Sequence, residues 1–140
     1  MQYYYRFPGF RIKTLTFSYD DGVKQDRRLI EILHAHGLCG TFNLNSSTLG
    51  EVEGSGAHGR LSRADACALY RTPGIEVAVH TYTHPHLEWQ PSATVMHEVV
   101  EDRRVLEEMF GYPITGMAYP YGTHAEHVVE VLRQAGIRPH

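Results

Sequence analysis

Four residues with metal-binding or acid–base side chains stand in two short stretches of this 140-residue chain. The stretch "TLTFSYDDGV", residues 14 to 23, ends a run of strand-forming residues in two adjacent aspartates, Asp20 and Asp21. The stretch "HTYTH", residues 80 to 84, spaces His80 and His84 so that one helical turn would point both imidazoles the same way. One carboxylate with two imidazoles is a common catalytic metal set, because it leaves coordination positions open for water and substrate.

The paired aspartates fit such a site, because adjacent carboxylates repel each other unless something compensates the charge. A divalent cation would take one as a ligand, lower the pKa of the other and offer it a polarised water molecule. The alternative is an ordinary turn without a metal, since Asp-Gly is a frequent turn dipeptide. A turn, however, needs no second carboxylate. For "HTYTH" alone, two ordinary loop histidines are the more frequent interpretation, and the combination with the aspartates reverses that balance.

A third stretch, "YPYG" at residues 119 to 122, has the composition of a tight turn. Taken alone, Pro-Tyr-Gly indicates a turn and nothing more. A turn at a strand end can also aim a backbone N–H into a site, where it would stabilise a developing oxyanion.

All three stretches lie at the ends of predicted strands in an alternating pattern of strands and helices. Alternating or apolar runs predict strands at 11–19, 40–45, 75–80 and 115–120, and residues 137–140 resemble the start of a fifth. Helices are predicted between them, at 24–37, 62–70, 92–110 and 124–136, and a loop at 46–60. This alternation predicts one α/β domain over residues 1–140 with a parallel sheet, in which the carboxyl ends of the strands carry the chemistry.

The predicted helices carry two further expectations. Ser62 is a candidate N-cap for the second helix. The third helix, 92–110, should bury an apolar stripe and turn its charged run "EDRR", residues 101–104, largely to the other side. That stripe consists of Val95, Val99, Leu106 and either Met109 or Phe110.

Composition argues against several classes of protein. The chain has a net charge of −3, so it lacks the excess of basic residues that is typical of a nucleic-acid binder. No apolar run approaches the ~20 residues of a membrane helix, and the first ten residues have no signal-peptide pattern. Cys39 and Cys67 form neither a CxxC motif nor a disulfide framework. We therefore expect no nucleic-acid partner, no membrane insertion and a cytoplasmic location.

Together, "TFSYDDG", "HTYTH" and "YPYG" resemble, in order and in strand-end placement, the first three motifs of the polysaccharide deacetylase family, or carbohydrate esterase family four. The resemblance runs from about residue 11 to the end of the chain. It implies a distorted β/α barrel and a metal-dependent hydrolase that removes acetyl groups, N-acetyl rather than O-acetyl, from an amino sugar or glycan. An amidase for small non-sugar amides and an inactive domain that binds a carbohydrate or a partner are the alternatives.

Carried over by position, the resemblance implies that Asp21, His80 and His84 hold one divalent metal. Zn²⁺ is the first expectation, with Co²⁺, Mn²⁺ and Ni²⁺ as alternatives. Asp20 would be the general base that activates water. The backbone N–H of Tyr121 would help to stabilise the tetrahedral oxyanion.

Two features depart from the family pattern. Many members have an arginine in the third motif that tethers the base, and Ala118 stands at the matching position here. The later family motifs, one of which supplies a histidine as general acid, have no match up to His140. Four or five strands also do not close a barrel. We therefore expect a partial barrel of about four to five parallel strands, incomplete at its C-terminal side, which can self-associate through that open edge.

Several other side chains have more than one interpretation. His124 and His127 lie three apart on a predicted helix, where a solvated face is a better interpretation than a metal site. Trp89 either stacks on a sugar ring or anchors its loop on the core. The tyrosines at 3–5 favour an edge strand or a partner contact over a sugar platform.

Overall fold

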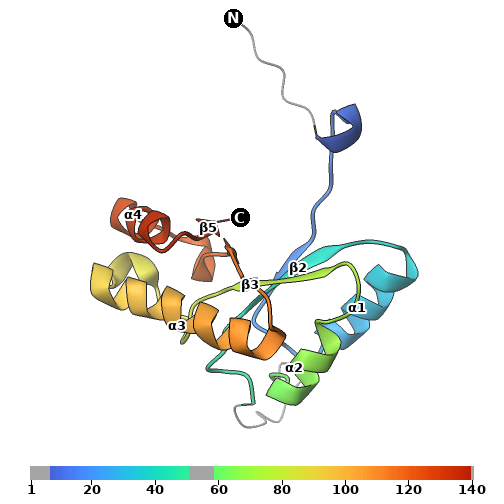
Figure 1. The fold of residues 1–140 in the computed structure, drawn as a ribbon, viewed down its shortest axis with the longest axis horizontal. Coiled ribbons are helices and arrows are strands. Elements are labelled where there is room, and N and C mark those ends of the chain that lie inside the picture. Colours follow the sequence, from blue (N-terminus) through green and yellow to red (C-terminus); the bar gives the residue numbers. More distant parts are fainter. Residues whose placement is uncertain (1–6, 51–58, 140) are drawn as a thin grey trace, which may run out of the picture.

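The computed structural model describes residues 7–50 and 59–139, which form one five-stranded parallel sheet flanked by helices (Figure 1). Neighbouring strands in the sheet are also neighbours in the chain, and a helix lies in every crossover, as in part of a β/α barrel. The predicted partial barrel of four to five parallel strands is confirmed. The strands are β1 (Ser18–Asp20), β2 (Gly40–Leu44), β3 (Ile75–Val79), β4 (Gly116–Met117) and β5 (Arg138–Pro139).

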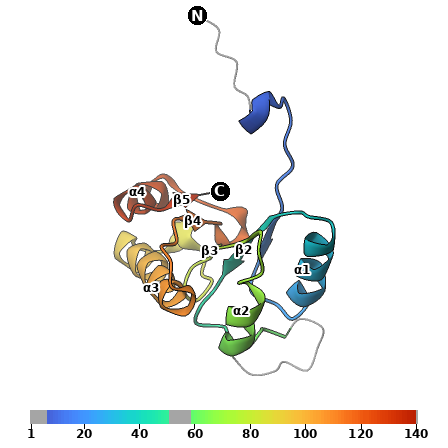
Figure 2. The same ribbon diagram turned by 45° about the vertical axis from the view of Figure 1, so that its right-hand side comes forward.

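The four predicted helices are present, and each begins and ends within two residues of its predicted ends. Ser62 caps the second as expected, because its Oγ accepts a hydrogen bond of 3.1 Å from the N–H of Asp65. Figures 1 and 2 show α4 lying against α3. Among the described residues, no helix is long and apolar enough to cross a membrane. The helices are α1 (Asp26–Ala35), α2 (Arg63–Leu69), α3 (Ser92–Phe110) and α4 (Glu126–Gln134), with short 3₁₀ turns η1 (Pro8–Phe10), η2 (Leu87–Trp89) and η3 (Pro120–Gly122).

The first strand is much shorter than the sequence predicts. The prediction of a strand over 11–19 is wrong for all but its last residues, since β1 begins at Ser18. β2 starts at Gly40 and its register pairs Thr41 with Ser18, so residues before Phe17 have no neighbouring strand to bond with. The segment instead leads away from the sheet in Figure 1, with Leu15 77% exposed.

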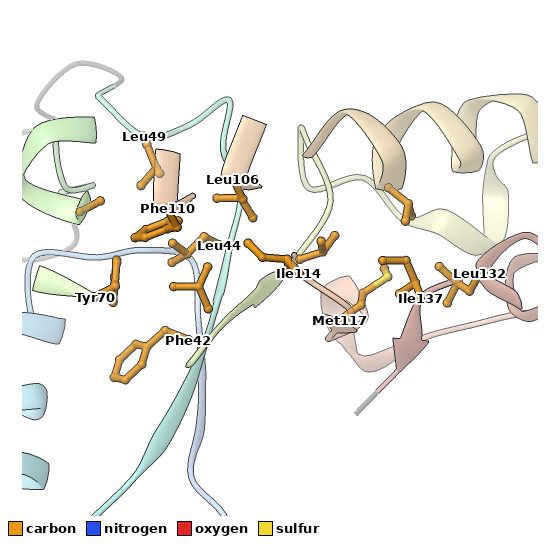
Figure 3. Packing of buried hydrophobic residues seen from close by; sticks show 14 of the residues in the cluster. Phe42, Leu44, Leu49, Tyr70, Leu106, Phe110, Ile114, Met117, Leu132 and Ile137 are labelled. Atoms are coloured by element: carbon orange, nitrogen blue, oxygen red, sulfur yellow. The ribbon is translucent and has the colours of Figure 1, made fainter. Parts of the chain in front are cut away.

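The hydrophobic core lies between the sheet and the helices (Figure 3). Phe42 and Leu44 of β2 point into it and are completely buried. Because side chains alternate along a strand, Thr41 and Asn43 point to the opposite face. There Thr41 donates a hydrogen bond of 2.7 Å to Glu76 of β3. The sheet therefore has an apolar face toward the helices and a polar face toward the interior of the partial barrel.

The long helix α3 differs from its predicted pattern in one respect. Its apolar stripe is buried as expected, with Phe110 rather than Met109 in the core. Asp102 belongs to the run "EDRR" but is 0% exposed, so the prediction that this run faces away from the core is wrong at that position. Asp102 and the buried Glu98 lie on the same stripe by their spacing along the helix, and both accept hydrogen bonds from the loop that follows β3.

The tyrosines at 3–5 and residues 51–58 of the predicted loop lie outside the described residues.

Candidate metal centre

Asp21, His80 and His84 come together at the carboxyl ends of β1 and β3. The Nε2 atom of His84 lies 3.2 Å from Nε2 of His80 and 3.6 Å from Oδ1 of Asp21. One ligand atom from each residue falls within 4.8 Å of the other two. Tetrahedral coordination with Zn–N bonds of 2.0–2.1 Å separates ligand atoms by about 3.3 Å. The spacing of the three side chains therefore fits one divalent cation.

The two adjacent aspartates are directed to different places by the turn that follows β1. Asp21 has a φ of 82° and Gly22 a φ of 65°, both in the left-handed region. Glycine suits this turn because other side chains are strained at such a φ, and a Cβ at Gly22 would also lie 2.9 Å from the side chain of Leu49. Asp21 thus joins the histidines, whereas Asp20 remains on β1 and accepts a hydrogen bond from Asn43. The separation explains how both carboxylates are accommodated.

The Asp21 carboxylate also has a cationic neighbour that the sequence did not indicate. The guanidinium of Arg60 lies 3.3 Å from Oδ1 of Asp21, and it donates a hydrogen bond to the Asp21 carbonyl. Oδ1 is nevertheless buried without a hydrogen-bond partner among the described residues. A buried acceptor left in this state is costly, and ligation of a cation would satisfy it.

His80 is held with one particular nitrogen facing the other ligands. The residue is 2% exposed, and its Nδ1 atom lies 2.9 Å from the carbonyl oxygen of Ala118, just after β4. A carbonyl can only accept, so this contact assigns the ring proton to Nδ1 and leaves the lone pair of Nε2 toward His84. Ala118 therefore contributes to the site through its backbone, although its side chain has no polar atom.

The loop between the two histidines is not a helical turn, so that part of the prediction is wrong. Thr81 has a φ of 71° and His84 a φ of 61°, and these left-handed residues make the imidazoles converge. The N–H of His84 donates to the hydroxyl oxygen of Thr81 over 3.1 Å. Burial, and then the neighbouring His80, lower the pKa of His84, which favours the neutral imidazole that a metal ligand requires.

Two acidic residues of α3 hold this loop in place. The carboxylate of Glu98 accepts hydrogen bonds from both the N–H and the hydroxyl of Thr83, at 2.8 and 2.7 Å. Asp102 accepts from the N–H of Ser46 at 2.7 Å and from the N–H of His80 at 3.1 Å. Sequence reasoning missed both acids. The signal was their spacing, because positions 98 and 102 fall in the same helical stripe as the buried valines.

The third predicted stretch also lies beside the histidines. The ring of Tyr121 makes an edge contact with His84 at 4.6 Å between centroids, and it stacks on His86 at 3.8 Å. The role of its backbone N–H stays a prediction. Trp89 also stacks on His86. Its side chain is 73% exposed, so it does not anchor its loop on the core.

His124 and His127 do not form a second metal site, and the prediction that both lie on one helix is wrong for His124, because α4 begins at Glu126. His127 contacts the carbonyl oxygen of Gln90, and His124 stacks on Tyr119. Within the ranges 7–50 and 59–139, the single group of side chains that could hold a metal is Asp21, His80 and His84.

Unusual backbone conformations gather at this site. Five non-glycine residues of the described chain have a positive φ, and Phe10 is the one that lies elsewhere. Such conformations cost about 1–3 kcal/mol each, persist where the surrounding structure holds them, and cluster at functional sites. The four at the site are Asp21, Thr81, His84 and Tyr121.

Comparison with protein-family models identifies the group of proteins to which this site belongs. Residues 9–140 match the polysaccharide deacetylase model. The match covers most of the chain, so the chain belongs to the polysaccharide deacetylase family. A search among curated proteins found no match.

Several solved structures share the fold at low sequence identity. The Streptococcus pyogenes deacetylase PplD in complex with acetate matches 89% of this chain with a TM-score of 0.77 and 19% identity. BC0361, a polysaccharide deacetylase from Bacillus cereus, matches 92% with a TM-score of 0.78 and 21% identity. BA3943, a family-four pseudoenzyme from Bacillus anthracis, matches 89% with a TM-score of 0.74 and 19% identity. The matches cover 54%, 40% and 41% of those chains, so this chain spans about half their length.

Proposed function

We propose that this protein is a metal-dependent hydrolase that removes acetyl groups, N-acetyl in preference to O-acetyl, from an amino sugar or glycan. The observation that carries the proposal is the convergence of one carboxylate and two imidazoles, with ligand atoms within 4.8 Å of one another, at the strand ends of a polysaccharide deacetylase fold. The similar Streptococcus pyogenes protein is described as a deacetylase in complex with acetate, the product that this reaction would release.

Each residue of the site has a separate task in this proposal. Asp21, His80 and His84 hold the cation, for which Zn²⁺ is the first candidate and Co²⁺, Mn²⁺ and Ni²⁺ are the alternatives. A bound divalent cation would polarise a water molecule and the acetyl carbonyl. Asp20, which stays outside the group of ligand atoms, takes a proton from the attacking water. The N–H of Tyr121 donates to the oxygen on which negative charge develops.

Acetate release tests the proposal directly. The protein, loaded in turn with Zn²⁺, Co²⁺, Mn²⁺ or Ni²⁺, is assayed with N-acetylated sugars of increasing length, O-acetylated sugars and simple non-sugar amides. We expect acetate from N-acetyl sugars, and its loss in the Asp21→Asn variant. Turnover confined to simple amides would establish the amidase alternative. No turnover on any substrate by protein with a full metal site would establish the inactive binding domain instead.

A further inference from the structure

Asn43 lies directly beside the proposed base. β1 and β2 pair in parallel with Asp20 opposite Asn43, and Nδ2 of Asn43 donates a hydrogen bond of 2.7 Å to Oδ1 of Asp20. This distance lies at the short end of the usual range for an N–H···O hydrogen bond. The residue Asp20 is exposed, so without this bond its carboxylate would be free to sample several rotamers.

The amide of Asn43 is itself fixed in position. Its side chain is 0% exposed, and Nδ2 also lies 2.8 Å from the hydroxyl oxygen of Ser18 and 3.3 Å from the carbonyl oxygen of Tyr19. All three contacts of this nitrogen are with β1, the strand that carries Asp20. The reversed amide would turn Oδ1 toward a carboxylate and a carbonyl, which only accept, so the network assigns the orientation.

Stability alone does not account for an amide at this position. A buried amide costs free energy unless its polar atoms are bonded, and Oδ1 of Asn43 has no hydrogen-bond partner among the described residues. A polar residue retained at such a cost is expected where it serves a functional group.

We propose that Asn43 is a positioning residue for Asp20. The inference rests on the proposed function, in which Asp20 accepts a proton from water. By bonding Oδ1, the amide restricts the carboxylate to one orientation and leaves Oδ2 available for that proton. Ala118, at the third-motif position, has no polar side-chain atom that could restrain the carboxylate in this way.

Kinetics of matched variants test this role. Asn43→Leu keeps the size of the side chain and removes the donor, whereas Thr41→Val removes a hydrogen bond to Glu76 on the same face of β2 and serves as the control. We expect Asn43→Leu to lower kcat for acetate release by about 10- to 100-fold, with KM and bound metal unchanged, and Thr41→Val to stay near wild type. In an Asp20→Asn background, Asn43→Leu should have no further effect, because it acts through Asp20. A purely structural role would instead lower metal content and reduce the activity of both backgrounds.

Crystal structures provide a readout that needs no turnover. In the wild type Asp20 should occupy one rotamer bonded to Asn43, and in Asn43→Leu its carboxylate should spread over more than one. Asn43→Ala, which cannot overpack the site, replaces Asn43→Leu if the latter fails to fold. A single unchanged rotamer in the variant would overturn the inference even in an active deacetylase. Loss of the rotamer in a protein that releases no acetate would support the inference and refute the proposed function.

Discussion

The Nδ1 atom of His80 lies 2.9 Å from the carbonyl oxygen of Ala118, so the end of β4 determines which nitrogen of this histidine faces the other ligands. β1 contributes Asp21 through the turn that follows it, and the loop after β3 contributes His84. Three strand ends thus cooperate in one site, as expected for parallel β/α folds.

Removal of either imidazole should remove the metal. We expect His80→Ala and His84→Ala to lose bound Zn²⁺ in elemental analysis, because two remaining ligands hold a divalent cation poorly. His86→Ala is the matched control, since this histidine lies in the same loop but outside the group of ligand atoms. Circular dichroism checks that each variant folds. Full metal retention in both His80→Ala and His84→Ala would disprove the ligand assignment.

Substitution of the two aspartates should separate metal binding from turnover. Asp20→Asn should keep the metal and lose about 10²- to 10⁴-fold in kcat, the usual contribution of a general base. Asp21→Asn should lose the metal and the activity together, because its carboxylate belongs to the group of ligand atoms. Metal content and acetate release are measured on the same samples. If the metal leaves with Asp20→Asn and stays with Asp21→Asn, the two roles are reversed.

Much of this fold could be predicted from the sequence, because strands and helices alternate and each has a clear apolar period. The four predicted helices are present in the structure, and Ser62 caps the second helix as its side chain predicts. The first strand was overestimated, since Ile12 and Leu15 have strand-like alternation but no neighbouring strand to pair with. Local pattern indicates that a segment can extend, whereas pairing depends on where another strand begins.

The ligand side chains were found in the sequence, and the groups that hold them were missed. His80 and His84 are recognisable by residue type and spacing once the paired aspartates at another strand end are considered with them. The loop that brings them together has a left-handed Thr81, which no propensity predicts for a β-branched residue. Asn43, Glu98 and Arg60 act through contacts with residues distant in the chain, so no local motif shows them.

Glu98 should matter for metal binding although it is no ligand. Glu98→Ala removes the acceptor for two hydrogen bonds from Thr83, next to His84. We expect a loss of about 10- to 100-fold in Zn²⁺ affinity, typical of residues that orient ligands, and a loss of about 1–3 kcal/mol in the free energy of unfolding. Glu101→Ala, on the same helix but paired with Arg104, is the control and should change neither by much. Competition with a chromogenic chelator measures the affinity, and equal affinities for the two variants would contradict the role of Glu98.

Asp102 should make the metal-free protein less stable as the pH rises. Burial raises the pKa of Asp102 to about 8, even though the N–H groups of Ser46 and His80 act in the opposite direction. Between pH ~4 and ~8 the unfolded chain therefore releases a proton that the folded protein retains. The contribution of this group to the free energy of unfolding is thus complete below pH ~4, and it falls by up to about 1.4 kcal/mol per pH unit across the window.

Asp102→Asn cannot ionise and should lack this fall, so the difference in stability between wild type and variant should shrink or change sign from pH 5 to pH 8. Urea unfolding with a chelator present measures both proteins, which keeps metal binding out of the comparison. A difference between the two proteins that is constant over this range would show that Asp102 has the same proton affinity in the folded and unfolded states.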